Sequence, residues 1–251
     1  MKKMVYLALI LGANCSSAMA QSSGSLITSV GAAWFDLGRS SATPLQSSSA
    51  AGTFTSEGTT AQVHNTFTAA LDLTYFVTDN IAVDLALGVP PKLKLYAQGT
   101  AAPFGSGGPS LGLGNLQPLV TTRAWPPILF VKYFFGDAQQ KLRPFVGVGV
   151  NYTWYSNINL DPTFSGALQA AAGPGGQVTA SFSPSWNPAF NAGASYNISR
   201  NWYATASVTY LPIKTNATVN SVAANGQTVL SSKSRITGDP WIGFVGIGYR
   251  F

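Results

Sequence analysis

The last eleven residues of the chain, 241–251, read Trp-Ile-Gly-Phe-Val-Gly-Ile-Gly-Tyr-Arg-Phe. Apolar or aromatic residues recur at alternate positions up to the terminal Phe251, and this is the period of a β-strand whose two faces meet different surroundings. The face that ends in Tyr249 and Phe251 is predicted to meet lipid. The opposite face then carries Ile242, Phe244 and Arg250.

The composition of the whole chain also points to a membrane. Charged residues make up 9% of the sequence, against about 25% in an ordinary soluble domain. No stretch of residues 21–251 approaches the roughly 18 consecutive apolar residues of a membrane helix. Strands that face lipid must therefore close into a barrel, because an open sheet edge would leave backbone groups unpaired in the bilayer. The basic residues are scattered along the chain, so nucleic-acid binding is not expected.

The N-terminus has the layout of a secretory signal. Two lysines near the start are followed by a short apolar run and by the small-residue sequence Ala18-Met19-Ala20. We expect residues 1–20 to be a cleaved signal peptide and residues 21–251 to form a single barrel domain. Without the two lysines, the 14 basic residues become 12, against 8 acidic residues.

Segments with the same alternation occur along the rest of the chain. There are eight of them, an even number as in bacterial barrels, and the links between them are alternately short and long. The sequence thus predicts an all-β fold: an eight-stranded antiparallel transmembrane up-and-down β-barrel of the outer membrane, with short periplasmic turns and four long extracellular loops. The predicted strands are 26–37, 66–77, 81–88, 121–135, 143–156, 185–198, 201–213 and 236–251.

The charged residues of these segments share the parity that points into the barrel. A charge at the lipid midplane would cost about 2–4 kcal/mol, so this placement favours the barrel interpretation. We expect the charges to form an ion-pair network that fills the lower barrel. This predicted lumen charge cluster comprises Asp72, Asp84, Lys132, Arg143 and Arg250.

Several apolar residues share the inward parity, where a water-filled pore would favour polar groups. One interpretation is a plug, because an eight-stranded barrel is only just wide enough for side chains to fill it. The other is an apolar channel that is entered from the extracellular loops and closed below by the charges. The predicted lining residues are Ile128, Phe130, Phe134, Phe145, Ile242 and Phe244.

Two proline pairs interrupt the alternation, Pro90-Pro91 and Pro126-Pro127. A proline removes a hydrogen bond from the strand ladder and is normally confined to edges and bulges. Both pairs lie toward the outer ends of the third and fourth strands. Either the ladder ends there, as the strands become loops, or the prolines mark a weak seam through which an apolar solute leaves sideways into the membrane.

The sequence offers little for catalysis. His64 is the sole histidine and is expected in or beside the first extracellular loop, as a solvated residue. No phosphate loop, dinucleotide motif, zinc spacing or calcium loop is present. We therefore predict no enzyme activity, no cofactor and no metal site.

At several positions the sequence resembles the outer-membrane protein W (OmpW) family. The similarity covers nearly all of residues 21–251 and is most specific in Trp125-Pro126-Pro127, in 132–138, in 143–152 and in 239–251. The resemblance implies an eight-stranded barrel with a hydrophobic channel that passes small apolar molecules without energy input. It also implies that Trp186 helps to line this channel, whereas the parity of its strand places Trp186 on the lipid side unless Pro188 introduces a bulge.

Two functions remain open on these grounds. The first is passive uptake of small hydrophobic molecules, with the loops too divergent to indicate which solute. The second is a closed structural barrel whose extracellular loops bind a partner, such as another cell, a phage or lipopolysaccharide. The expected partners are outer-membrane lipid and lipopolysaccharide and a small hydrophobic solute, and the protein is expected to be a monomer.

Overall fold

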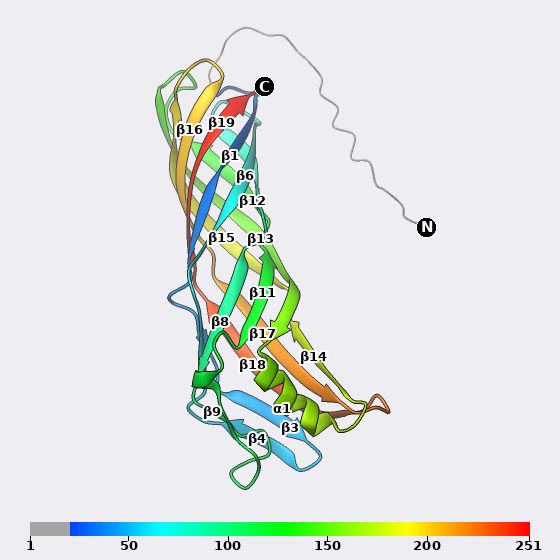
Figure 1. The fold of residues 1–251 in the computed structure, drawn as a ribbon. Coiled ribbons are helices and arrows are strands. Elements are labelled where there is room, and N and C mark those ends of the chain that lie inside the picture. The colour runs from blue at the N-terminus through cyan, green and yellow to red at the C-terminus, as the bar shows by residue number, and fades with distance from the viewer. Residues whose placement is uncertain (1–20) are drawn as a thin grey trace, which may run out of the picture.

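The computed structural model describes residues 21–251, which form an elongated molecule with a barrel at one end and a folded extension at the other (Figure 1). The predicted signal peptide, residues 1–20, lies outside the described residues. Within residues 21–251 there is no helix that is long and apolar enough to cross a membrane. The C-terminus lies at the free end of the barrel (Figure 1).

The predicted eight-stranded antiparallel barrel is confirmed. Neighbouring strands follow the order β12-β7-β6-β1-β19-β16-β15-β13, and β13 pairs with β12 to close the ring. Closure leaves no sheet edge in the lipid. The barrel strands are β1 Leu26–Asp36, β6 Thr66–Phe76, β7 Ile81–Gly88, β12 Ile128–Phe134, β13 Leu142–Leu160, β15 Ser185–Asn197, β16 Trp202–Tyr210 and β19 Trp241–Arg250.

The four long links fold into a second body of β-structure beyond the barrel, which we call the extension. In one part, β11 (Val120–Trp125) pairs with the outer end of β13 and with β8 (Lys92–Gln98), and β8 pairs with β5 (Thr60–Val63). The other part is a six-stranded sheet. Its strands are β2 Ser41–Ala42, β3 Leu45–Ser49, β4 Gly52–Ser56, β14 Gln177–Phe182, β17 Ile213–Val222 and β18 Thr228–Gly238.

An apolar core holds the extension together. Leu113, Phe164, Leu168 and Leu230 are buried in it. Phe164 and Leu168 come from α1 (Pro162–Ala172), a helix that Asp161 caps by accepting the backbone N–H groups of Thr163 and Phe164. The remaining short elements are β9 Thr100–Ala101, β10 Leu111–Gly112 and the 3-10 helix η1 Leu113–Asn115.

Prolines account for three places where the strand prediction was wrong. The seventh predicted strand, 201–213, ends at Tyr210, and Ile213, just past Pro212, already belongs to β17 of the extension. The fourth predicted strand is broken at Pro126-Pro127 into β11, which belongs to the extension, and β12, which belongs to the barrel. The last strand begins at Trp241 and not at residue 236, because Asp239-Pro240 separates it from β18. In each place the chain leaves one ladder of backbone hydrogen bonds at a proline, which has no N–H group to donate, and enters another ladder.

The outer surface of the barrel is apolar. Side chains such as Val30, Phe67 and Val148 are exposed there, as lipid-facing side chains should be. Exposed tryptophans surround the end nearest the extension, where aromatic side chains mark the lipid headgroup level. We call this set the outer aromatic belt; its members are Trp34, Trp125, Trp154, Trp186 and Trp241.

Candidate solute pathway in the barrel

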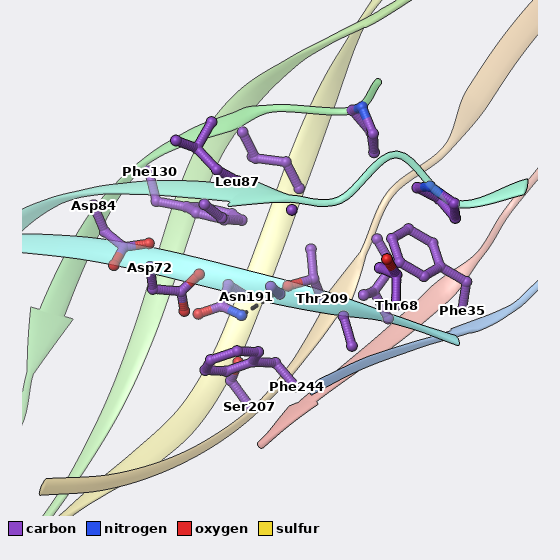
Figure 2. A pocket seen from close by; sticks show the side chains of 18 of the residues that line it. Phe35, Thr68, Asp72, Asp84, Leu87, Phe130, Asn191, Ser207, Thr209 and Phe244 are labelled. Carbon is purple, nitrogen blue, oxygen red and sulfur yellow. Dashed lines mark hydrogen bonds between the residues drawn. The ribbon is translucent and has the colours of Figure 1, made fainter. Parts of the chain in front are cut away.

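The half of the barrel nearest the extension encloses a pocket of about 70 Å³, here called the upper pocket. Figure 2 shows Phe130 and Phe244 on its sides, Asp72 and Asp84 toward one end, and Phe35 toward the other. The surface is mainly apolar, with a few hydroxyl and amide groups. Besides the residues already named, the lining includes Ala33, Thr68, Ala70, Ala86, Ile128, Lys132, Asn191, Ser207, Thr209 and Ile242.

Glycines on neighbouring positions make room for the aromatic rings of the lumen. Phe130 pairs across the ladder with Gly149, and an added Cβ at Gly149 would lie 2.6 Å from the Phe130 ring. A Cβ at Gly246 would lie at the same distance from the Phe244 ring. Any side chain at these positions would push a ring into the pocket.

Polar groups in the pocket wall pair mostly with one another. The Asn191 side-chain amide donates to the Thr209 hydroxyl at 2.8 Å, whereas the Asn191 Oδ1 is buried without a hydrogen-bond partner in the structure. Besides the Asp72 carboxylate, the wall of the upper pocket therefore offers an incoming molecule one buried amide acceptor among apolar groups.

A buried ion pair forms the lower end of the pocket. Lys132 Nζ lies 2.8 Å from Asp84 Oδ1, and the Thr74 hydroxyl donates to Asp84 Oδ2 at 2.5 Å. The ammonium also lies 5.5 Å from the centre of the Phe130 ring and 5.0 Å from that of Phe145. Such desolvated charges are tolerated because each has a partner of opposite charge or a ring face.

Below the ion pair the barrel is filled by the side chains of what we call the floor, which leave a cavity of about 20 Å³ beside Asp72, Thr74 and Lys132. The Phe134 ring packs at a tilt against Phe76 and Phe145, with ring centres 4.8 Å apart in both cases. The cluster also contains Ile27, Ala82 and Tyr203. The floor blocks a straight passage to the periplasmic end in this conformation.

Arg143 closes the base of the floor. Its guanidinium donates to the backbone carbonyls of Asp79 at 2.6 Å and Gln21 at 2.9 Å. The Gln21 side chain in turn donates to the Ser195 hydroxyl at 2.6 Å. Arg143 of β13 therefore links Gln21 to the turn at Asp79, and the Gln21 side chain links both to Ser195 of β15.

The structure separates the predicted lining residues into two groups. Ile128, Phe130, Ile242 and Phe244 lie on the upper pocket, as expected from their parity. The remaining two predicted residues, Phe134 and Phe145, pack in the floor. The plug interpretation therefore describes the lower half of the lumen, whereas the upper half holds an apolar pocket.

The predicted single charge network is wrong. Asp84 and Lys132 form the one ion pair found among residues 21–251, and Asp72 faces the same pocket. The rings of the floor separate this group from Arg143, which bonds to backbone carbonyls. Arg250 is half-buried at the strand end, where its backbone pairs with Asn201. These charged side chains lie at different levels along the barrel axis, so they do not contact one another as a single network.

Trp186 does not line the lumen. Its side chain is 73% exposed on the outer surface and stacks on Tyr152, with ring centres 4.7 Å apart. The β13–β15 register runs without a shift through Pro188, so there is no bulge to turn the tryptophan inward. The parity of the strand predicted this orientation, and the expectation drawn from the family resemblance was wrong.

The ladder of backbone hydrogen bonds in the barrel wall is interrupted beside the upper pocket. The β7–β12 ladder ends at the pair Ala86 and Ile128, and pairing resumes only with Lys92 and Arg123 in the extension. Between these pairs, residues 87–91 face residues 124–127, and four of these nine positions are prolines that have no N–H to donate. Within this stretch the Ala124 N–H still donates to the Pro91 carbonyl at 3.2 Å. Each strand keeps its other neighbour, since Val89 N–H donates to Ala69 and Tyr152 N–H donates to Pro127. We call this interruption the wall gap.

Two side chains connect the pocket with the outside through the wall gap. Leu87 is 37% exposed and Val89 is 56% exposed on the barrel surface, and both also line the upper pocket. Sequence reasoning placed the prolines correctly but missed these two residues, because the parity of β7 assigns Leu87 to the lipid side alone. The other pocket residues that it missed are small polar ones, which carry no pattern of their own.

His64 lies away from the pocket. It is exposed beside β5 and stacks on Tyr96, with ring centres 3.8 Å apart. Among the described residues, no group of three His, Cys, Asp or Glu side chains could hold a metal ion.

Comparison with known proteins agrees with the fold. The family model described as OmpW family matches residues 23–251. Outer membrane protein W of Salmonella typhimurium is 32% identical over 189 residues, covering 75% of each chain. The dibenzothiophene metabolism operon protein PahQ of Pseudomonas aeruginosa is 27% identical over 195 residues, covering 77% of this chain and 76% of its own.

Among solved structures, the outer membrane protein OprG from Pseudomonas aeruginosa superposes with a TM-score of 0.72 at 23% identity, covering 92% of this chain and 98% of its own. This likeness concerns the fold. Taken with the family match across the whole described barrel and extension, it places the protein in the cell outer membrane. The chain belongs to the OmpW family.

Proposed function

We propose that the protein takes up small hydrophobic molecules passively from outside the cell and releases them sideways into the outer membrane through the wall gap. The observation that carries this proposal is that Leu87 and Val89 line the upper pocket and are also exposed on the barrel surface. The name of one relative, a dibenzothiophene metabolism operon protein, supports an apolar substrate class.

The closed floor favours the sideways route. A solute that enters the upper pocket meets the Lys132–Asp84 ion pair and then the packed rings below it. To pass, an apolar molecule would have to separate these buried charges without offering them a new partner, whereas the wall gap leads directly into hydrocarbon.

The pocket must widen for a solute to pass. Its volume of about 70 Å³ is smaller than the roughly 150 Å³ of a cavity that holds benzene. Flexible contacts at the gap, where ladder hydrogen bonds are missing, are the least costly part of the wall to move. We therefore expect Leu87 and Val89 to shift when a solute leaves.

The remaining expected properties accompany this proposal. The barrel closes within one chain, so a monomer suffices for transport. Its partners are the solute and the lipids of the outer membrane, including lipopolysaccharide. We assign no catalytic step. A closed structural barrel whose extension binds another cell, a phage or lipopolysaccharide is the alternative that the following experiment separates.

Uptake of an apolar fluorescent dye, 1-N-phenylnaphthylamine, tests the proposal in cells with intact lipopolysaccharide. Cells that carry the protein should take up the dye faster than cells with an empty vector. Leu87→Cys with Pro126→Cys, bridged by a disulfide or a short bis-maleimide, should return the rate to near the empty-vector level. Cys15, the sole cysteine, lies within the predicted signal peptide and does not interfere.

The matched control is a bridge between Val83→Cys and Val131→Cys. These positions are paired partners in the intact part of the same two strands, and both face lipid. This bridge should leave uptake unchanged. Equal slowing by both bridges, or none by either, would rule out exit at the wall gap. Equal rates for cells with and without the protein would overturn the uptake function itself.

A further inference from the structure

Three strands form the wall of the molecule just outside the membrane: β8, β11 and the outer end of β13. Arg123 in β11 is paired with Lys92 on one side and with Ser156 on the other. Two residues along β11 toward the barrel, Trp125 pairs with Trp154, and both belong to the outer aromatic belt. A row of polar and basic groups therefore lies directly above a row of tryptophans.

The basic groups in this row have no anionic partner. Lys92, Lys94 and Arg123 are exposed, and none of them forms an ion pair with a carboxylate of residues 21–251. Like charges that face each other across a ladder destabilise a sheet. Lys92 opposite Arg123 is such a pair, and a bound anion would turn this repulsion into attraction.

The surface is hollowed at the same place. Lys92 and Arg123 line a cleft of about 300 Å³ together with Thr121, Asn157 and Asn159. The cleft forms where the β11–β13 register shifts between Thr121 and Arg123, opposite Asn157, whose φ of 51° lies in the left-handed region. Its other lining residue, Thr122, is also uncharged, so the cleft holds cations, hydroxyls and amides with no acidic group.

Arg123 is held in place within the cleft. One of its terminal nitrogens, Nη1, donates to the Pro90 carbonyl at 3.2 Å. Pro90 belongs to the wall gap, so this contact ties the cleft to the upper edge of the gap. A guanidinium that is fixed on one side is preorganised to bind phosphate oxygens with its remaining N–H groups.

The height of the cleft identifies the kind of anion. Two residues of a strand span about 7 Å, so Arg123 lies within about 7 Å of the Trp125 level along the strand. Interfacial tryptophans lie at the headgroups. The cleft therefore lies where the phosphates of outer-leaflet lipids are found, and it faces outward toward them.

We propose that the cleft of Lys92 and Arg123 is a binding site for the phosphate groups of a phosphorylated glycolipid of the outer leaflet. The two cations contact the phosphate, while Thr121, Asn157 and Asn159 provide hydrogen bonds to the headgroup. The apolar part of the lipid lies against the outer aromatic belt. This proposal does not depend on solute uptake.

Binding of lipid A to the purified protein tests the site. The bisphosphorylated lipid and a dephosphorylated form are titrated in EDTA, so that no divalent cation bridges phosphates, and native mass spectrometry gives the apparent Kd. The unaltered protein should bind the bisphosphorylated lipid more tightly. Lys92→Gln with Arg123→Gln should weaken that binding about tenfold or more and leave binding of the dephosphorylated lipid unchanged.

Two further double variants separate the site from overall charge. Lys141→Gln with Lys233→Gln removes the same charge from exposed positions elsewhere and should bind like the unaltered protein. Lys92→Arg with Arg123→Lys keeps the charge and should retain most of the affinity. Equal binding by all variants, equal loss in the Lys141 and Lys233 control, or no preference of the unaltered protein for phosphate would each overturn the proposal.

Discussion

The two halves of the lumen are enclosed by the same eight strands, yet one is open and the other is packed shut. The upper half is lined at many positions by small residues such as Ala33, Ala86 and Ser207, and its rings lie against glycines. The floor holds Phe76, Tyr203 and Arg143, which are among the largest fully buried side chains. Side-chain volume, and not strand number, therefore decides where a barrel of this width is open.

The halves also differ in the barrel wall beside them. At the floor, Phe134 and Phe145 are paired partners in an unbroken ladder. At the upper pocket, prolines end the β7–β12 ladder. The open half of the lumen thus coincides with the interrupted part of the wall, which is the arrangement that the proposed sideways exit requires.

Replacement of one phenylalanine in each half should show this difference most strongly. Phe145→Ala should lower the free energy of unfolding by about 4 kcal/mol, because it leaves a cavity among packed rings. Phe244→Ala should lower it by about 2 kcal/mol. Because Phe244 already borders open space, the protein loses mainly the hydrophobic free energy of burying the ring and gains little new cavity. Urea unfolding in phospholipid vesicles measures both values.

For dye uptake, the larger effect is expected from the other variant of the two. Phe244→Ala widens the upper pocket and should speed uptake at equal protein level, whereas Phe145→Ala should leave the rate unchanged. Equal losses of stability, or faster uptake from the floor variant, would contradict the division of the lumen into an open half and a packed half.

The boundary between the halves should be the next most sensitive position. Lys132→Met leaves Asp84 buried with Thr74 as its remaining partner, and we expect a loss of about 3 kcal/mol in the free energy of unfolding. Lys132→Met combined with Asp84→Asn removes both charges and should recover most of that loss, as measured by the same urea titration. If the double variant is no more stable than the single one, the ion pair does not secure the boundary.

The smallest effect is expected outside the lumen. Trp186→Ala removes a lipid-facing ring and its stacking on Tyr152, so stability should fall by about 1 kcal/mol. Dye uptake should stay the same, because the side chain does not reach the pocket. A changed uptake rate would show that Trp186 influences the lumen despite its exposed position.

Most of the barrel could be predicted from the sequence, because alternation reports which face of a strand meets lipid. The inward orientation of Asp84, Lys132 and Phe130 followed from this rule alone. The extension could not be predicted in the same way. Its strands are short, its core is shared among distant segments such as Leu113 and Leu230, and its loops are rich in small polar residues that carry little period.

Within the site, the alternation of residues predicted which side chains point into the lumen, but not how far along the barrel axis each one lies. Phe130 and Phe134 share one face of β12, yet the first lines the upper pocket and the second packs in the floor. The cross-strand neighbours decide this, and they depend on the register. Leu87 shows a second reason why alternation is not sufficient. Its position in β7 predicts a lipid-facing side chain, yet it also lines the pocket because the ladder beside it is missing.

The length of β13 determines where a solute first meets the protein. Its 19 residues extend about 60 Å along the strand and, at a tilt of about 40°, about 45 Å along the membrane normal. The hydrocarbon-facing band of such a barrel is about 25 Å tall. The strand therefore carries the extension about 20 Å beyond the hydrocarbon, so a solute that follows the proposed route would first meet the protein at the extension, outside the membrane.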